Sequence, residues 1–304
     1  MSQWQAVVAQ PQQLGESPFW HPREQRLYWI DIELKQIRRL DPAAGQVEIW
    51  PMPGNPGCIA PAGDGGLVIA LRDGVYRAPA WGGRLARLAA APYDPATTRF
   101  NDGKADPAGR FWAGSMYEPR DLPQAALYSF DMRGGRSVVE TKASHATVAN
   151  GLAWSPDART VYWADTSSHA VYAWDWDARS NAMTRYRVFQ QFPRKPAGWK
   201  PGQPGYGGRP DGATVDAQGN YWVAMYEGQR VLQIAPAGQI LREIATPTRC
   251  PTMPCFGGPD LKTLYLTTAR DGRPADELRE QPQAGCVFAL PVDVAGRPVD
   301  FVRD

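Results

Sequence analysis

The chain has 304 residues, of which 43% are hydrophobic, so it can bury a sizeable core. Its 33 basic and 31 acidic residues are spread along the chain and leave a formal charge of +2, which predicts no nucleic-acid partner and no anionic membrane. The N-terminal sequence lacks a basic n-region and an apolar h-region, and no apolar run approaches the roughly 18 residues of a membrane span, so we expect a cytoplasmic protein.

The 30 Gly, 29 Pro, 12 Trp and 12 Tyr residues favour an all-β fold, because aromatic residues prefer strands while Gly and Pro interrupt them. A single domain covering 1–304 is common among β-propellers and barrels of this length. The four cysteines contain no C-x-x-C pair, so we expect reduced, structural thiols at Cys58, Cys250, Cys255 and Cys286.

A short run of aromatic and aliphatic residues recurs six times along the chain. In chain order the runs are LYWIDI from Leu27, GLVIAL from Gly66, RFWAGS from Arg110, TVYWAD from Thr160, NYWVAM from Asn220 and TLYLTT from Thr263. They begin 39, 44, 50, 60 and 43 residues apart, and most have an apolar stretch and a turn before them and another strand after them. Because three or four strands in each repeat of this length is typical of propeller blades, the sequence predicts a six-bladed β-propeller.

The two ends of the chain are predicted to complete one blade together. The last repeat, from Cys255 to Leu290, is one strand short, whereas WQAVVAQ at Trp4 to Gln10 is a strand with no blade of its own. Pairing the two would close the ring. Segments 122–124 and 192–209 interrupt the repeat, and we expect them to be surface loops.

Four repeats place a carboxylate or a carboxamide at a similar distance before the aromatic run. Glu16 lies 11 residues before Leu27, Asn101 lies 9 before Arg110, Asn150 lies 10 before Thr160 and Asp211 lies 9 before Asn220. Since the innermost strand of each blade lines the central channel, these side chains should meet on the propeller axis. One Asn-Gly or Asp-Gly pair alone is better explained as a turn, but four polar residues in register favour a shared site.

The predicted site has the chemistry of a metal centre. Oxygen atoms from two carboxylates and one or two amides suit a hard divalent cation such as Ca²⁺, Mg²⁺ or Mn²⁺. The sequence therefore predicts a metal site on the central axis. No histidine occupies the corresponding position before an aromatic run. His21 and His169 lie beside turn residues, and His145 is the one histidine that could approach the site.

The sequence resembles the family of senescence marker protein (regucalcin), gluconolactonase and the luciferin-regenerating enzyme. The resemblance covers nearly the whole chain, through LGESPFW from Leu14, RFNDGKADPAGRFWAGSM from Arg99, NGLAW from Asn150, PDGATVDAQGNYWVA from Pro210 and CFGGPDLKTLYLTTARDG from Cys255. It implies one catalytic metal ion held at Glu16, Asn150 and Asp211. The metal varies within the family, so its identity does not transfer; we expect Ca²⁺, with Zn²⁺, Mn²⁺ or Fe²⁺ as alternatives. It also implies that the positions of Arg99 and Asn101 hold the substrate.

Two departures from regucalcin concern the substrate. A substrate-side Glu of regucalcin aligns without gaps on Pro119, and Glu118 stands one residue earlier, so Glu118 is a candidate substrate-binding residue. The segment 192–209, which directly precedes Pro210 and Asp211, is longer than its counterpart in regucalcin. We therefore expect a different substrate preference.

The activity that the resemblance implies is hydrolysis of a sugar lactone, such as gluconolactone or a pentonolactone, to the aldonic acid. Opening a cyclic ester requires a nucleophilic water, stabilisation of charge on the carbonyl oxygen and a proton for the ring oxygen. A metal ion can supply the first two, and Asp211 is both a candidate ligand and a candidate general base or acid. Arg99 and Asn101 would hold the sugar hydroxyls and the carbonyl group, while Asp102 is expected to cap its own Asn-Asp-Gly turn.

Other hydrolytic devices find no support, because the sequence contains neither a G-x-S-x-G elbow nor an H-E-x-x-H helix. Two alternatives stay open. The same site would support a metal-dependent arylesterase or phosphotriesterase, and the chain could be a metal-binding propeller without catalysis. The presence of Arg99 and Asn101 beside the ligand set argues against the second. The sequence makes no prediction of oligomeric state.

Overall fold

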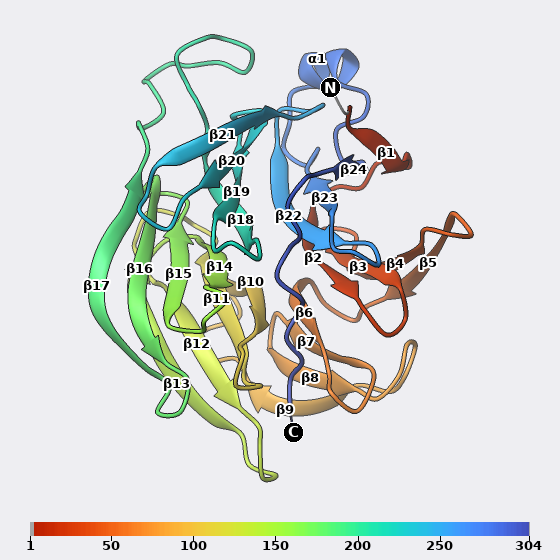
Figure 1. Cartoon of the computed structure of the whole chain (residues 1–304), viewed down its shortest axis with the longest axis vertical. Helices are drawn as coiled ribbons and strands as arrows, with labels where there is room; N and C mark the ends of the chain where they lie inside the picture. Colours follow the sequence, from red (N-terminus) through yellow and green to blue (C-terminus); the bar gives the residue numbers. More distant parts are fainter. Residues whose placement is uncertain (1–2, 304) are drawn as a thin grey trace.

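A computed structural model describes residues 3–303 as six antiparallel sheets of four strands each, arranged as blades around a central axis (Figure 1). The predicted all-β, six-bladed propeller is confirmed. In each blade the innermost strand comes first in the sequence, except that the sixth blade takes its outermost strand from the start of the chain.

The first five blades follow one another along the chain, each as four consecutive strands. The first three are β2 (Gly15–His21), β3 (Arg26–Asp31), β4 (Gln36–Asp41) and β5 (Gln46–Pro51); β6 (Pro56–Pro61), β7 (Leu67–Leu71), β8 (Gly74–Ala78) and β9 (Ala86–Ala90); and β10 (Thr98–Ala105), β11 (Phe111–Tyr117), β12 (Ala125–Asp131) and β13 (Val138–Ala146). The next two are β14 (Ala149–Trp154), β15 (Thr160–Asp165), β16 (Ala170–Asp177) and β17 (Ala182–Gln191); and β18 (Arg209–Val215), β19 (Tyr221–Tyr226), β20 (Arg230–Ile234) and β21 (Ile240–Ala245).

The sixth blade joins the two ends of the chain. It contains β22 (Pro251–Gly257), β23 (Thr263–Thr268), β24 (Val287–Pro291) and β1 (Gln5–Val8), with the short helix α1 (Ala275–Glu280) between β23 and β24. Strand β1 pairs antiparallel with β24, so that Gln5 stands opposite Ala289. The ring is thereby closed by backbone hydrogen bonds between the first and last strands of the sequence.

Burial falls from the axis outward. Every residue of β2, β6, β14 and β22 is buried, whereas most residues of the outer strands β13, β17 and β21 are exposed. The hydrophobic core consists of six clusters, and each lies between two neighbouring blades. The inner strands of neighbouring blades pack so closely that a Cβ atom on Gly103 of β10 would lie 2.5 Å from Cys58 Sγ of β6. The inner strands are therefore held on both faces.

In each of two blades, a buried aspartate at the equivalent position fixes the hairpin between the first two strands. The Asp216 carboxylate accepts hydrogen bonds from the backbone N–H groups of Gln218 and Asn220, each at 2.9 Å, and from Trp222 Nε1 at 2.9 Å. Asp106 accepts a hydrogen bond from Trp112 Nε1 at 2.8 Å in the same way. Because both indoles are fully buried, each aspartate satisfies a donor that water cannot reach.

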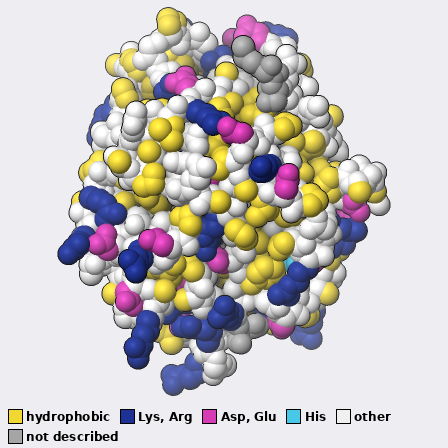
Figure 2. Space-filling model, in the orientation of Figure 1, with side chains coloured by type: hydrophobic (Ala, Val, Ile, Leu, Met, Phe, Trp, Pro, Cys, Tyr) yellow, Lys and Arg dark blue, Asp and Glu magenta, His cyan; other side chains and the backbone are white. Residues whose placement is uncertain are grey.

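The C-terminal segment 292–303 crosses the axis on one face of the propeller, where it lies in front of the blades in Figure 1. Its backbone bonds to four blades, through Leu261, Ala217, Pro61 and Gly109 among others. On this face, basic and acidic side chains are interspersed with hydrophobic ones (Figure 2). We call residues 292–303 the strap.

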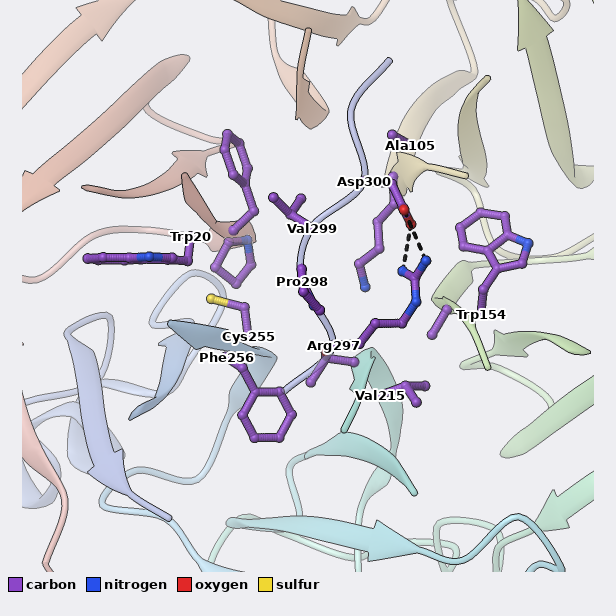
Figure 3. Close-up of a pocket in the computed structure, with 15 residues that line it drawn as sticks. Trp20, Ala105, Trp154, Val215, Cys255, Phe256, Arg297, Pro298, Val299 and Asp300 are labelled. Atoms are coloured by element: carbon purple, nitrogen blue, oxygen red, sulfur yellow. Dashed lines mark hydrogen bonds and ion pairs between the residues drawn. The ribbon is translucent and has the colours of Figure 1, made fainter. Parts of the chain in front are cut away.

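Beneath the strap lies a small cavity of about 70 Å³, lined by residues from the ends of the inner strands (Figure 3). Arg297 of the strap faces Asp300, with Nη2 and Oδ1 2.9 Å apart. Lys104 also lines this cavity, and its Nζ donates hydrogen bonds to the carbonyl oxygens of Leu152, at 2.9 Å, and Ala213. The strap and Lys104 therefore fill the channel at this end of the inner strands.

Two further sequence expectations can be compared with the structure. The four cysteines are free and buried. Between residues 3 and 303, no helix is both long and apolar enough to cross a membrane.

The aspartate of the fifth-blade hairpin should be important for stability. We expect Asp216→Ala to lower the free energy of unfolding by about 3 kcal/mol, because it leaves several buried donors without an acceptor. Denaturant unfolding followed by fluorescence measures the change. Asp121→Ala, at an exposed position, should change stability by less than about 0.5 kcal/mol. Equal effects of the two substitutions would contradict the role given to Asp216.

Candidate active site

A cavity of about 190 Å³ lies at the opposite ends of the inner strands from the strap. Five of the six residues predicted from the sequence line it, namely Glu16, Arg99, Asn101, Asn150 and Asp211. All five are buried, with exposed fractions between 3% and 6%. The structure therefore brings together side chains from four blades that are up to 195 residues apart in the sequence (211 − 16).

A β-bulge accompanies each of these polar residues. The strand register shifts between Glu16 and Phe19, between Asn101 and Gly103, between Asn150 and Ala153, and between Pro210 and Ala213. A bulge bends the strand and redirects its side chains. The glycine after Asn150 has φ +62°, which a residue with a side chain rarely adopts. The Asn-Gly and Asp-Gly pairs thus mark bulges within strands rather than the turns that join them.

A chain of hydrogen bonds crosses the pocket from one blade to the next. Arg99 Nη1 donates to Asn101 Oδ1 at 2.8 Å, and Asn101 Nδ2 donates to Asn150 Oδ1 at 3.0 Å. Asn150 Nδ2 donates to Thr166 Oγ1 at 2.8 Å, and this hydroxyl donates to the carbonyl oxygen of Pro210 at 2.7 Å. The amide oxygen of Asn150 is thereby fixed in orientation beside the residue that precedes Asp211.

The carboxylates of the pocket repel one another in a buried environment. Burial, and then the negative charges of Asp211 and Asp102, raise the pKa of Glu16 well above its ordinary value. Burial, and then the charge of Asp102, raise the pKa of Asp211 to about 8. Burial also raises the pKa of Asp102, whose Oδ1 is buried and has no hydrogen-bond partner. A nearby cation would relieve this repulsion.

The polar atoms of the pocket fit a divalent cation. Glu16 and Asp211 offer carboxylate oxygens and Asn150 offers an amide oxygen, which is the donor set that hard cations prefer. No cluster of three or more His, Cys, Asp or Glu side chains suited to a metal ion occurs within residues 3–303. The predicted set is of a different kind, because one of its three members is an amide.

The hydrogen bonding of Asp102 differs from the local turn cap that the sequence predicted. Its Oδ2 accepts a hydrogen bond from the backbone N–H of Leu152 at 2.9 Å, so that its carboxylate reaches from the third blade into the fourth. The residue itself has φ +34°. Asp102 therefore links two blades below the pocket, beyond the local cap that the Asn-Asp-Gly sequence suggested.

Glu118, the sixth predicted residue, lies beside the pocket and is not among the residues that line it. Its carboxylate forms two contacts of 2.8 Å with the guanidinium of Arg72 and lies 3.8 Å from Arg99 Nε. Hydrogen bonding to Arg72 lowers the pKa of Glu118. In this structure Glu118 contacts the pocket through Arg99.

His145 is not part of this site, so the possibility that it approaches Asn150 is wrong. The residue is exposed and lines a different cavity, together with Trp163 and Tyr172. His169 has a structural contact instead, since its Nε2 lies 2.8 Å from Tyr206 Oη in the segment 192–209.

One buried carboxylate connects the long segments around the pocket mouth. Glu227 lies 2.9 Å from Lys195 of the loop 192–208, 3.4 Å from Arg209 and 3.0 Å from Arg273, which precedes α1. Its side chain is only 4% exposed. Although burial raises the pKa of Glu227, the surrounding cations hold it below its ordinary value. The loop, strand β18 and the segment before α1 thus share one anchor.

Several residues of the pocket were missed by sequence reasoning. They do not occupy the position in the repeat at which the inner-strand residues were found, and most lie in connections on the pocket side of the blades. These residues are Met116, Arg120, Val148, Thr166, Ser167, Arg209, Tyr226 and Asp271. For Thr166 a signal exists, because it directly follows the aromatic run TVYWAD. Arg120 and Asp271 belong to connections that differ in length from blade to blade, and no periodic signal marks them.

The family model described as "SMP-30/Gluconolactonase/LRE-like region" matches residues 14–270. The 6-deoxy-6-sulfogluconolactonase of Pseudomonas putida is 44% identical over 290 residues, covering 95% of each chain. A pentonolactonase of Haloferax volcanii is 35% identical over 304 residues, covering 96% of this chain and 95% of its own.

Among solved structures, the calcium-binding protein regucalcin of Agrobacterium tumefaciens superimposes with a TM-score of 0.90 and 26% identity, over 100% of this chain and 98% of its own. The family resemblance recognised in the sequence is confirmed, as is the enzyme class, a lactonase. The chain belongs to the SMP-30/gluconolactonase/LRE-like family.

Proposed function

We propose that this lactonase hydrolyses a sugar lactone to its aldonic acid with one divalent cation held by Glu16, Asn150 and Asp211. The observation that carries the proposal is the convergence of two buried carboxylates and an oriented amide oxygen in one pocket, beside the buried guanidinium of Arg99. Relatives named for a sulfogluconolactone and a pentonolactone support a sugar lactone as the substrate class. Calcium is the first candidate ion, with Zn²⁺, Mn²⁺ and Fe²⁺ as alternatives.

Without a cation, the buried carboxylates of the pocket are costly. Glu16 and Asp211 are buried, and the charge of Asp211 adds to burial in raising the pKa of Glu16. Burying two like charges is unfavourable unless a counter-charge is present. When bound, such a cation supplies Lewis acidity toward the lactone carbonyl and lowers the pKa of a coordinated water.

The substrate side of the pocket is assigned to Arg99. Its Nη1 is used by the carbonyl oxygen of Phe100 and by Asn101, while the other nitrogens of the guanidinium have only contacts of 3.8 Å with Met116 Sδ and Glu118. These nitrogens can donate to a lactone oxygen. Both N–H donors of Asn101 are used within the protein, by Ala149 and Asn150, so we assign Asn101 to orienting Arg99 and Asn150. Glu118 would orient Arg99 from its other side.

Asp211 is assigned two roles, as a cation ligand and as the group that moves a proton. Without a cation, burial and the charge of Asp102 raise its pKa to about 8, whereas a bound cation would favour the ionised carboxylate, which is the form that can accept a proton. It can accept a proton from the attacking water and return one to the ring oxygen of the leaving group. Among the residues that the structure describes, the other carboxylates that line the pocket are Glu16 and Asp271, and no histidine lines it.

Thr166 is assigned to positioning Asn150. An asparagine amide can turn either its oxygen or its nitrogen toward a cation, and only the oxygen binds one. Because Thr166 accepts from Nδ2 and donates to Pro210, it selects the orientation in which Oδ1 faces the pocket. Such supporting contacts typically change metal affinity by about 10-fold to 100-fold.

Removal of metal tests the proposed function. We expect treatment with a chelator to abolish hydrolysis of gluconolactone and of a pentonolactone, and readdition of a divalent cation to restore it, because water activation depends on the ion. Base consumption measures the rate. Full lactonase activity in demonstrably metal-free protein would contradict the mechanism. A higher rate with aryl esters or organophosphates than with sugar lactones would contradict the substrate class.

The dual role of Asp211 is tested with Asp211→Asn, which keeps an oxygen ligand but removes the basic group. We expect kcat at saturating metal to fall by about 10² to 10⁴, the usual contribution of a general base. Calorimetry verifies saturation before each rate is measured. If excess metal restores the turnover of the variant to that of the wild type, Asp211 is a ligand alone.

The role of Thr166 is tested by metal binding rather than by activity. We expect Thr166→Val to weaken calorimetric metal affinity about 10-fold to 100-fold, because the amide of Asn150 loses the partner that orients it. Thr166→Ser, which keeps the hydroxyl, should restore most of the affinity. Ser167→Ala serves as the matched control in the adjacent residue. Unchanged affinity in a folded Thr166→Val protein would show that Asn150 does not need this contact.

A further inference from the structure

Two arginines in the pocket are not explained by metal binding or by the reacting carbonyl. Arg120 lies in the connection between β11 and β12, and Arg209 is the first residue of β18. Both line the pocket that contains Glu16 and Asp211, and they come from the third and fifth blades. The pocket therefore has a positive side chain on each of two separate walls, in addition to Arg99.

The carboxylates beside these arginines do not balance them. Glu118 is held by Arg72 through two contacts of 2.8 Å, lies 3.8 Å from Arg99, and is also influenced by the charge of Arg120. Across the pocket mouth, Glu227 serves Lys195, Arg209 and Arg273. Glu277 pairs with Arg273 and Arg249, and the charge of Glu33 acts on Arg99 and Arg72. Four carboxylates therefore face seven cations, which leaves an excess of positive charge around the mouth.

Glu16 and Asp211, the two carboxylates of the pocket lining that are assigned to the proposed ion, do not reduce this excess of positive charge. Once ionised, Glu16 and Asp211 would carry two negative charges, which a bound divalent cation would neutralise. Asp271 is then the lining carboxylate left to offset Arg99, Arg120 and Arg209. A neutral lactone would leave this imbalance in place, whereas an anionic substituent would reduce it.

The conformations of the two arginines suit a charged ligand. Arg120 is exposed, has φ +61° and forms no ion pair among residues 3–303; its guanidinium lies 3.7 Å from Met116 Sδ. Arg209 is held in place, since its guanidinium stacks 5.1 Å from the ring centre of Tyr226 and lies 3.4 Å from Glu227. One arginine is therefore preorganised and the other is free to close on a ligand.

We propose that the substrate is a sugar lactone whose ring carries an anionic tetrahedral substituent, a sulfonate or a phosphate, and that Arg120 and Arg209 bind this group. The inference rests on the proposed lactonase reaction at Asp211. A guanidinium presents several N–H donors in one plane and matches such oxyanions closely. The positive charge at the mouth also attracts an anionic substrate from solution. Arg120 and Arg209 thus determine specificity, and the chemistry remains with the cation ligands and Arg99.

The test compares three lactones of one ring: gluconolactone, 6-deoxy-6-sulfogluconolactone and 6-phosphogluconolactone. The readout is the ratio of kcat/KM for each anionic lactone to that for gluconolactone. We expect this ratio to be about 10 or more for the wild type and to fall about 10-fold in Arg120→Gln and in Arg209→Gln, because each loses a charge-assisted contact. Arg84→Gln removes an exposed charge from the β8–β9 connection, outside the pocket, and should keep the wild-type ratio.

The outcomes separate the inference from the proposed function. If the wild type hydrolyses all three lactones with equal kcat/KM, or if both arginine variants keep the wild-type ratio, the anion site is wrong and the lactonase mechanism stands. If the wild type hydrolyses none of them with metal present, the proposed function is wrong and the inference falls with it. A larger ratio for one of the two anionic lactones supports the site and identifies which group it takes.

Discussion

The structure depends on one packing constraint: each inner strand lies between two neighbouring blades and is buried along all or most of its length. Polar side chains are costly in such a position, so they can occur only where a strand ends, bends or finds a partner in the next blade. Glu16, Asn150 and Asp211 satisfy this condition at the bulges that begin their strands. The same packing that stabilises the ring therefore collects polar groups at one end of the axis.

The charges along the axis follow from that arrangement. Near the pocket, burial raises the pKa values of Glu16, Asp102 and Asp211, because the ionised carboxylates lose contact with water. Toward the strap, Lys104 supplies a positive charge of its own and donates to backbone carbonyl oxygens. Burial lowers the pKa of Lys104, while the charge of Asp102 opposes that change. The axis thus has a cationic side chain at the end near the strap and a group of buried carboxylates at the other end.

Much of this could be predicted from the sequence, because a propeller repeats its geometry and the repeat can be counted. The aromatic runs identified the second strands, and counting back from them found Glu16, Asn101, Asn150 and Asp211, all of which line one pocket. The rest depends on contacts between blades or on connections, which no count along one repeat can reveal. His145 is close to Asn150 in sequence, yet it belongs to the end of an outer strand and faces another cavity.

Closure of the sixth blade by β1 also has a consequence for how the protein folds. Strand β1 is made first and pairs with β24, so during synthesis it has no partner until about 280 residues have followed. The strap likewise fastens the second and third blades to the end of the chain. Contacts so distant in sequence form late and slow the approach to the native state. Until they form, β1 and β24 each expose an unpaired edge that can pair with another chain, which makes incomplete rings the species most prone to aggregate or to exchange strands.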